Sequence, residues 1–337
     1  MEDVFSSAYL TIAATASKSS LDGFLLHQTR RSTIGIQTSQ GILYLAEAID
    51  NFQADVERAI LNTRGWVLQE RALSRRTIHF TATQVYWECG EGVCCETLAK
   101  LGNRQSQFLG DSNFPTYGLQ HYKDERIRLV QYLYRVYSGL ILTKSSDRSR
   151  AILGLQTRLS STFKSKAKYG IISAYFERTF LWQATISGSM SKINYEPNHT
   201  VPSWSWMAVI GRIQYMEIPF GGVAWTGDVE TPFQPGFDDA KWDGRLVAKA
   251  RRLAIEDAEF DEKCQVDSSL YKFDPSCWKC VVVGKSKVAN EAGDKNQYVL
   301  LIRERSSGVT PSVYERVGVG ILLQTHVGVE TTIVHII

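Results

Sequence analysis

The N-terminal part of the chain opens with an apolar run followed by a helical spacing. Residues 9–14 form a compact, partly β-branched run that ends in a polar, glycine-containing stretch at 17–23, which predicts a buried strand leading into a loop. Apolar residues then recur every three or four positions, as expected for one face of an amphipathic helix. These are Leu45, Ile49, Phe52, Val56 and Ile60.

A second helix and a hairpin are predicted next. Residues 66–73 contain neither Gly nor Pro and are expected to form a short helix. Apolar residues alternate with other residues at 78–80 and again at 85–87, on either side of a turn at 81–83. This alternation predicts a β-hairpin.

The middle of the chain carries further helical periodicities. Residues 122–142 repeat apolar side chains at Ile127, Val130, Tyr134, Tyr137 and Ile141. Asp147 is expected to cap a helix that carries Ile152, Leu155 and Leu159. Another helix is predicted through Tyr175, Phe176 and Trp182.

The pattern changes after Pro202. Short alternating runs at 246–255, 280–283, 298–302, 317–322 and 331–337 are separated by clusters of small and polar residues. Such spacing predicts a mainly antiparallel β unit, in which Gly318 and Gly320 mark a bulge. We therefore expect an α+β or α/β protein with a boundary near 198–203.

Composition and charge narrow the classes of function. The chain has 337 residues, and its 38 basic residues barely exceed its 35 acidic ones. A net charge of +3 does not favour a nucleic acid or a membrane surface as partner. The acidic start lacks the basic region of an export signal. The apolar runs are shorter than the ~20 residues of a membrane span. The six cysteines are expected to be reduced. We expect a cytoplasmic protein.

Three stretches together resemble the heterokaryon-incompatibility (HET) domain family of filamentous fungi. They are VFSSAYLTIAA at residues 4–14, RGWVLQERALS at 64–74 with VYWEC at 85–89, and PSWSW at 202–206 with YERVGV at 314–319. The resemblance implies the C-terminal half of a HET domain at 1–110, a helical region at 111–200 and a β-rich unit at 201–337. The Tyr-Trp-Gly and Trp-Ile-Asp-x-x-Cys signatures of the family's first half do not occur in this sequence, so we expect an N-terminally truncated form.

The resemblance also implies a biological role. HET proteins act in fungal non-self recognition, in which incompatible cell fusion leads to programmed cell death. For this chain it implies an effector or sensor whose partner is another protein of the incompatibility system, with self-association left open.

A distant similarity of HET domains to Toll/interleukin-receptor-like (TIR) domains implies one enzymatic alternative. TIR enzymes cleave the nicotinamide bond of NAD with a helical glutamate that follows a tryptophan within one turn. Trp66 and Glu70 are four positions apart here and would share a helix face. Glu70 is the catalytic candidate, Arg64, Trp66 and Gln69 are the binding candidates, and NAD would be substrate rather than cofactor.

The competing hypothesis is an interaction module with a partial TIR-like α/β layer. It predicts that Glu70 is ion-paired to Arg64 or Arg71, that Trp66 fills the core, and that an apolar surface is exposed where the missing half of the domain should pack. The enzyme hypothesis predicts an unpaired Glu70 carboxylate in an open pocket. We expect the interaction module for this chain, because the first strand-to-helix loop, one wall of a nucleotide pocket, is absent from it.

Other chemistry is less strongly indicated. Cys277 and Cys280 form a C-x-x-C pair without the strand-to-helix context of a redox site. Cys89, Cys94 and Cys95 would need a fourth ligand, such as Cys264 or a histidine, to bind zinc, so no metal is expected. Trp204 and Trp206 are expected to share one side of a strand-like segment and to pack in the core.

Overall fold

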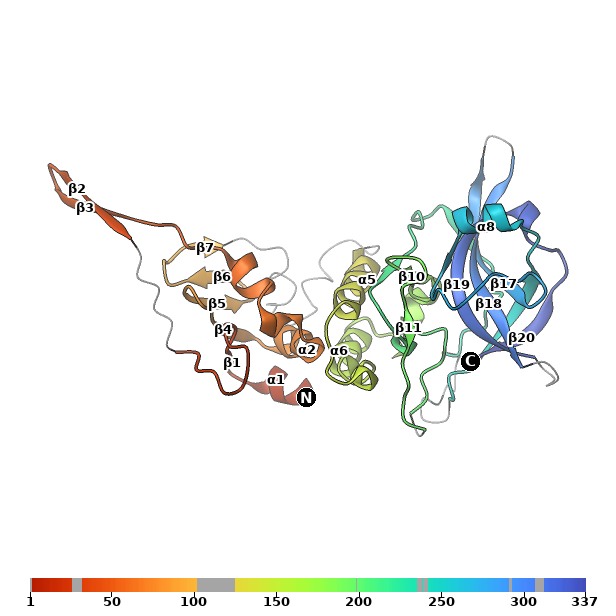
Figure 1. Cartoon of the computed structure of the whole chain (residues 1–337), viewed down its shortest axis with the longest axis horizontal. Coiled ribbons are helices and arrows are strands. Elements are labelled where there is room, and N and C mark those ends of the chain that lie inside the picture. Colours follow the sequence, from red (N-terminus) through yellow and green to blue (C-terminus); the bar gives the residue numbers. More distant parts are fainter. Residues whose placement is uncertain are drawn as a thin grey trace. The chain divides into compact units, whose positions relative to one another are not determined.

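The computed structural model describes residues 2–25, 32–101, 125–197, 199–234, 238, 242–290, 293–306 and 312–337. The chain forms two compact units. The first comprises Met1–Tyr122 with Leu140–Leu142, and the second comprises Lys123–Gly139 with Thr143–Ile337. Both units contain helices and strands, which confirms a mixed α+β class (Figure 1).

The first unit is built on a five-stranded sheet of order β1-β4-β5-β6-β7. The strands are β1 (Thr11–Ala13), β4 (Arg76–Phe80), β5 (Val85–Cys89), β6 (Gly92–Cys95) and β7 (Lys100–Leu101), accompanied by α1 (Glu2–Ser7) and α2 (Gly65–Leu73). The pair β1–β4 is parallel and the other pairs are antiparallel. The predicted short helix and hairpin are confirmed. The first strand is found, but it is not buried as predicted, because Ile12 at its centre is exposed. The described residues of this unit do not show a TIR-like layer.

The helix predicted from Leu45 to Ile60 is wrong. Leu45 lies on β3 (Gly41–Ala46), which pairs with β2 (Thr33–Thr38). Only two short helical segments follow, a π-helical η1 (Gln53–Glu57) and a 3-10 η2 (Ile60–Thr63). Phe52 and Val56 are four apart and both buried in the core with Tyr86. Leu45 and Ile60 fit the same spacing by coincidence, and both are exposed.

The second unit begins with helices. Its first helix, α5 (Glu125–Ser138), confirms the predicted helix between 125 and 138, while residues 122–124 lie outside the described residues. The helix ends before Ile141, which was expected on its apolar face and is exposed. Asp147 does not cap a helix through its side chain. It ends a 3-10 turn, η3 (Ser145–Asp147), and its backbone carbonyl accepts hydrogen bonds from the N–H groups of Arg150 and Ala151. The helix α6 (Leu153–Thr162) starts later. The third predicted helix, α7 (Phe176–Phe180), stops before Trp182.

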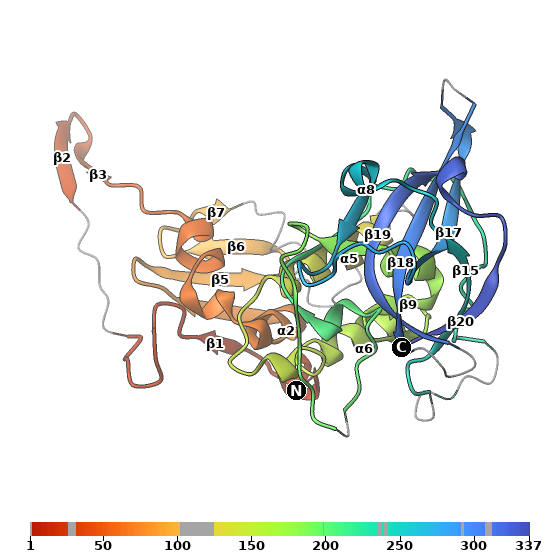
Figure 2. The same ribbon diagram turned by 45° about the vertical axis from the view of Figure 1, so that its right-hand side comes forward.

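Five strands of the second unit close into a barrel, which Figure 2 shows as the ring of blue arrows. They are β15 (Leu246–Arg252), β17 (Trp278–Ala289), β18 (Lys295–Ser306), β19 (Val313–Leu323) and β20 (Thr332–Ile336). Neighbours pair antiparallel except β19–β20, and β20 pairs with β15 to complete the ring. Closure satisfies the strand edges within the ring, and all five predicted β runs are found in it.

Shorter elements complete the second unit. They are β8 (Ala167–Lys168), β9 (Ile171–Ile172), η4 (Ser173–Tyr175), β10 (Trp182–Ala184), β11 (Ser191–Lys192), η5 (Trp206–Ala208), β12 (Val209–Ile210), β13 (Ile213–Tyr215), β14 (Val223–Trp225), α8 (Asp257–Lys263), β16 (Cys264–Val266) and η6 (Gln324–His326). None of the helices in the described part of the chain combines the length and hydropathy that a bilayer crossing requires.

The structure places the division between units elsewhere than the boundary expected near 198–203. One apolar core contains residues from both sides of that segment, including Phe180, Trp204, Leu246 and Leu300. Because the barrel buries its apolar side chains against the preceding helical segments, helices and barrel form one unit.

The two tryptophans of the PSWSW segment are buried, but they do not share one face of a strand. Trp204 lies in a turn, donates its indole N–H to the carbonyl of Gly244, and stacks with Trp242. Trp206 begins η5 and packs against Tyr134 and Tyr137 of α5. The two indoles therefore belong to different aromatic clusters.

Candidate functional site

The four site residues predicted from the sequence lie on or next to helix α2. Trp66, Gln69 and Glu70 are in the helix, and Arg64 directly precedes it. Gly65 begins the helix where the chain is tightly packed, because a Cβ there would come within 2.6 Å of Leu142. The backbone N–H of Gly65 donates to the carbonyl of Ile141 at 2.8 Å. This close approach explains why the RGW sequence starts the helix with glycine.

The structure separates the four predicted residues by exposure. Gln69 is buried and Arg64 is exposed, while Trp66 and Glu70 are both half-buried one turn apart. Burial raises the pKa of Glu70, and the charge of Arg64 partly offsets that rise. Within the described residues, the Glu70 carboxylate has neither a hydrogen bond nor an ion pair.

Arg71 pairs with a different acid, Glu88 on β5. The guanidinium Nε and Nη2 donate to the two carboxylate oxygens at 2.8 and 2.7 Å. His79 on β4 places its Nε2 atom 3.0 Å from Oε2 of Glu88, and its Nδ1 atom lies 3.2 Å from the Thr15 hydroxyl. We call Thr15, Arg71, His79 and Glu88 the buried polar network, since each is at most 6% exposed.

The protonation of this network follows from its contacts. Burial opposes ionisation of Glu88, but the Arg71 charge and the bonds from His79 and Arg71 hold the pKa of Glu88 at about 2. Burial lowers the pKa of His79 against the opposing effect of Glu88. A neutral His79 must carry its proton on Nε2, because a carboxylate only accepts, so Nδ1 accepts from Thr15.

The buried polar network is structural in this arrangement. It ties α2 to the facing strands β4 and β5, and its four residues are each at most 6% exposed, which leaves little surface for a substrate. The sequence did not indicate this network, because His79 and Glu88 alternate with the apolar Ile78 and Trp87. The alternation was used to predict a hairpin and not the partners of its polar residues. In the structure, the polar residues occupy the more buried face of the hairpin.

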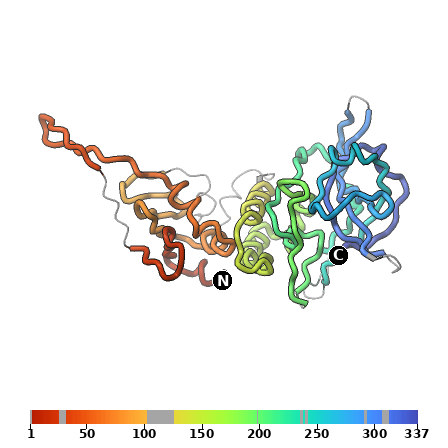
Figure 3. The backbone as a smooth tube through the Cα atoms, in the orientation of Figure 1, coloured from red at the N-terminus to blue at the C-terminus, as the bar shows by residue number. Residues whose placement is uncertain are grey.

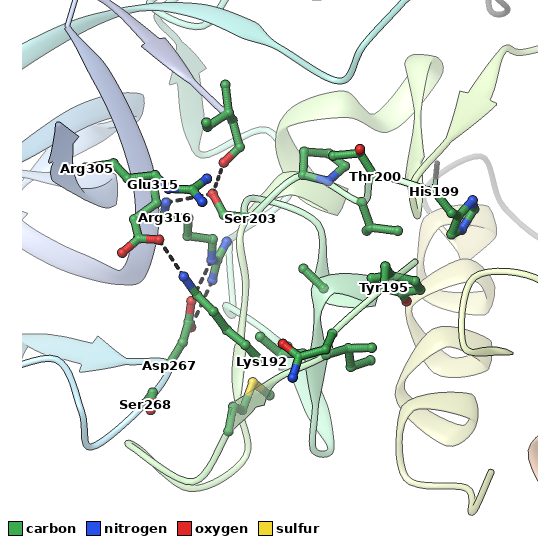
Figure 4. A pocket seen from close by; sticks show the side chains of 18 of the residues that line it. Lys192, Tyr195, His199, Thr200, Ser203, Asp267, Ser268, Arg305, Glu315 and Arg316 are labelled. Carbon is green, nitrogen blue, oxygen red and sulfur yellow. Dashed lines mark hydrogen bonds and ion pairs between the residues drawn. The ribbon is translucent and has the colours of Figure 1, made fainter. Parts of the chain in front are cut away.

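A cavity of about 420 Å³ lies in the second unit, between β11 and β19 (Figure 4). Lys192 reaches Glu315 with an Nζ–Oε2 distance of 2.5 Å, and Arg303 approaches the other carboxylate oxygen at 2.5 Å. Deeper in the wall, Arg316 pairs with Asp267 at 2.9 Å. Each of the two carboxylates on this wall is thus paired with at least one cation, and the three cations Lys192, Arg303 and Arg316 outnumber the carboxylates Glu315 and Asp267.

A β-bulge positions Arg316. Leu301 pairs with Gly318 and Ile302 with Arg316, so Val317 is the extra residue on β19. Of the two glycines predicted to mark a bulge, Gly318 lies next to it, whereas Gly320 pairs in regular register with Val299. The sequence did not indicate that the bulge turns a charged side chain inward.

The surroundings of the cysteines do not favour the redox or zinc sites considered from their spacing in the sequence. Burial raises the pKa of Cys280 to about 12 and also raises that of Cys277, which favours unreactive thiols. Cys94 is exposed and its neighbour Cys95 is buried, so the two side chains diverge. No group of three potential metal ligands occurs among the residues that the structure describes.

The hairpin of β2 and β3 presents an apolar surface, and its course can be followed near the red end of the trace in Figure 3. Ile34 faces Leu45 and Ile36 faces Leu43 across the pair. Since side chains alternate along a strand, these four lie on one face. We call them the aliphatic face, and their exposed fractions run from 43% to 68%.

Comparison with family models, with curated proteins and with solved structures finds no match to this chain.

Proposed function

We propose that this chain is a protein-interaction module that acts through the aliphatic face of the β2–β3 hairpin. The observation that carries the proposal is the exposure of all four residues of this face, Ile34, Ile36, Leu43 and Leu45. Scattered exposed apolar residues are ordinary, but a contiguous apolar face is typical of a binding surface. An exposed apolar surface is one of the three features expected for an interaction module, and its expected place, where the missing half of the domain should pack, stays a prediction.

The other two expected features are not met, because Glu70 has no ion pair among the described residues and Trp66 is half-buried rather than in the core. An unpaired carboxylate of raised pKa one turn from Trp66 favours a second candidate, a TIR-like NAD glycohydrolase. There Glu70 would stabilise the oxocarbenium-like transition state as nicotinamide departs. Three cavities of 420 to 590 Å³ are lined by residues of the described part of the second unit, and Glu70 lines none of these three, so we rank this candidate second.

The resemblance to HET domains supplies the biological setting of the proposal. In that setting the chain is a cytoplasmic effector or sensor of heterokaryon incompatibility, and binding through the hairpin leads to programmed cell death. The block RGWVLQERALS, which carries much of the resemblance, forms α2 and supplies Arg71 to the buried polar network. Its role in this proposal is to hold the fold that presents the hairpin.

Expression of the full chain in a filamentous fungus tests the proposal. We expect wild type to reduce survival relative to an empty vector, and Leu43→Lys to restore survival because a buried lysine opposes docking of the aliphatic face. Gln37→Lys adds the same charge on the opposite face of the hairpin and is expected to behave like wild type. Glu70→Ala is also expected to behave like wild type.

Each contrary result has a definite meaning. Wild-type survival equal to that of the empty vector would refute the role in cell death. Toxicity that persists in Leu43→Lys but disappears in Glu70→Ala would replace the interaction module with the enzyme. Protein levels and thermal unfolding midpoints of the variants are compared, since both hairpin positions are exposed and their substitution should leave the fold intact.

A further inference from the structure

We infer that a cavity of the second unit binds a small phosphate monoester that carries an apolar group. The cavity has a volume of about 590 Å³ and is lined by α5, by α7 and by residues 215–220 at the end of β13 and after it. Two arginines, Arg128 of α5 and Arg178 of α7, belong to its lining. The cavity shares no residue with the β2–β3 hairpin, so the inference does not depend on the proposed function.

Arg178 is fixed in place at this cavity. Its Nη1 and Nη2 atoms donate to the carbonyls of Ile218 and Pro219 at 2.7 and 3.1 Å. Its guanidinium lies 4.2 Å from the centre of the Phe220 ring and 5.6 Å from that of Trp225. Because these contacts already order the cation, little side-chain entropy is lost when an anion binds to it.

Arg128 approaches the same ring from α5. Its guanidinium lies 5.2 Å from the centre of Phe220. The side chain is exposed and forms neither a hydrogen bond nor an ion pair among the described residues, so the fold does not require its charge. Two guanidinium groups beside one ring repel each other, and an anion bound between them offsets that repulsion.

The charges of the lining favour a dianion. Among the described residues that line the cavity, one carboxylate, Glu217, accompanies the two arginines, and it is exposed and ion-paired with neither. A phosphate monoester carries a charge of about −1.5 to −2 at pH 7 and offers three acceptor oxygens. Guanidinium groups donate to phosphate through two parallel N–H groups. A carboxylate offers a single charge, so we expect the phosphate monoester to bind more tightly.

The remaining wall of the cavity favours an apolar group on the phosphate. Met216 and Ile218 are buried, and Tyr215 and Phe220 are half-buried. Inorganic phosphate is too small to cover this wall as well as contact the arginines. The volume also lies within the range of about 300–1,000 Å³ that is usual for small-molecule sites.

Isothermal titration calorimetry of the purified full chain with phenyl phosphate, in a buffer free of other phosphate, tests the inference. We expect saturable binding, about tenfold tighter than that of inorganic phosphate, because the phenyl ring removes apolar surface from water. Benzoate has the same ring but one charge, and should bind about tenfold more weakly than phenyl phosphate.

Three variants locate the site. Arg128→Met should weaken phenyl phosphate binding about tenfold, since a hydrogen bond between charged groups is lost. Arg135→Met is the matched control, because Arg135 is also exposed on α5 and stacks on Tyr132 at 5.7 Å, but does not line the cavity. It should bind like wild type. Glu217→Gln removes a like charge and should tighten binding about threefold, which a damaged fold would not produce.

Several outcomes would overturn the inference. Wild type that unfolds cooperatively on heating but shows no saturable binding of phenyl phosphate has no such site. Equal affinities of Arg128→Met and Arg135→Met would place the binding elsewhere on the molecule. Inorganic phosphate or benzoate that binds as tightly as phenyl phosphate would contradict the assigned ligand class.

Discussion

Replacing Arg316 by methionine is expected to destabilise the second unit by about 3–5 kcal/mol. The Arg316 side chain is fully buried, and its Nε donates to Asp267 at 2.9 Å. Its Nη1 donates to the carbonyl of Phe180 at 3.1 Å, its Nη2 donates to that of Trp182, and the guanidinium lies 3.4 Å from the centre of the Trp182 ring. Methionine fills similar space but leaves a buried carboxylate and two carbonyls without their donor.

Urea unfolding followed by tryptophan fluorescence measures this loss, because Trp182, Trp204, Trp206, Trp225, Trp242 and Trp278 all belong to the second unit. Arg305→Met is the matched control, since Arg305 is exposed, and should change stability by less than about 0.5 kcal/mol. Removing the second charge as well, with Asp267→Leu, should recover part of the loss. A loss below about 1 kcal/mol in Arg316→Met would show that this ion pair does not hold the barrel to β10 and α7.

Glu88→Gln is expected to destabilise the first unit by about 3–5 kcal/mol. The amide keeps the shape of the side chain but leaves the Arg71 cation buried without a counter-charge, and it weakens the bond to His79. Urea unfolding followed by hydrogen exchange of the β4 and β5 amides reports on this unit. Glu91→Gln, an exposed neighbour on the β5–β6 turn, is the control and should leave exchange unchanged.

Acid should act on the same network. The folded-state pKa of Glu88, about 2, lies below its ordinary value of 4.5, so its stabilising effect is complete above pH 4.5 and is lost as the pH falls toward 2. The pKa of His79 is lowered from 6.5, so the unfolded chain takes up that proton first and stability also falls as the pH drops below 6.5. Glu88→Gln should flatten the acid limb below pH 4.5, and a limb as steep as that of wild type would contradict the assignment.

The elements that the sequence predicted are those with long or strictly alternating patterns. The barrel strands alternate between flanking turn residues, and α2 follows from a stretch without Gly or Pro, so local sequence was sufficient for both. The β2–β3 hairpin was missed because Leu45 also fits a helical spacing with Phe52 and Val56. Spacing alone does not distinguish an exposed strand residue from a helix residue, since burial depends on the whole fold.

The sites were harder to predict than the elements, for a physical reason. Glu70 was singled out from its spacing to Trp66, and whether its carboxylate is paired depends on partners distant in sequence. Arg71 pairs with Glu88, and Arg316 with Asp267. These contacts join residues 17 and 49 positions apart, and neither leaves a local periodic signal.

The choice between binding and catalysis can be tested with purified full-length chain, wild type and Glu70→Ala, incubated with NAD while free nicotinamide is quantified over hours. If the chain acts through the hairpin, nicotinamide should appear no faster with wild type than in the buffer blank, although the protein is folded. Release by wild type that disappears in Glu70→Ala would contradict this account and establish Glu70 as the carboxylate of an NAD glycohydrolase.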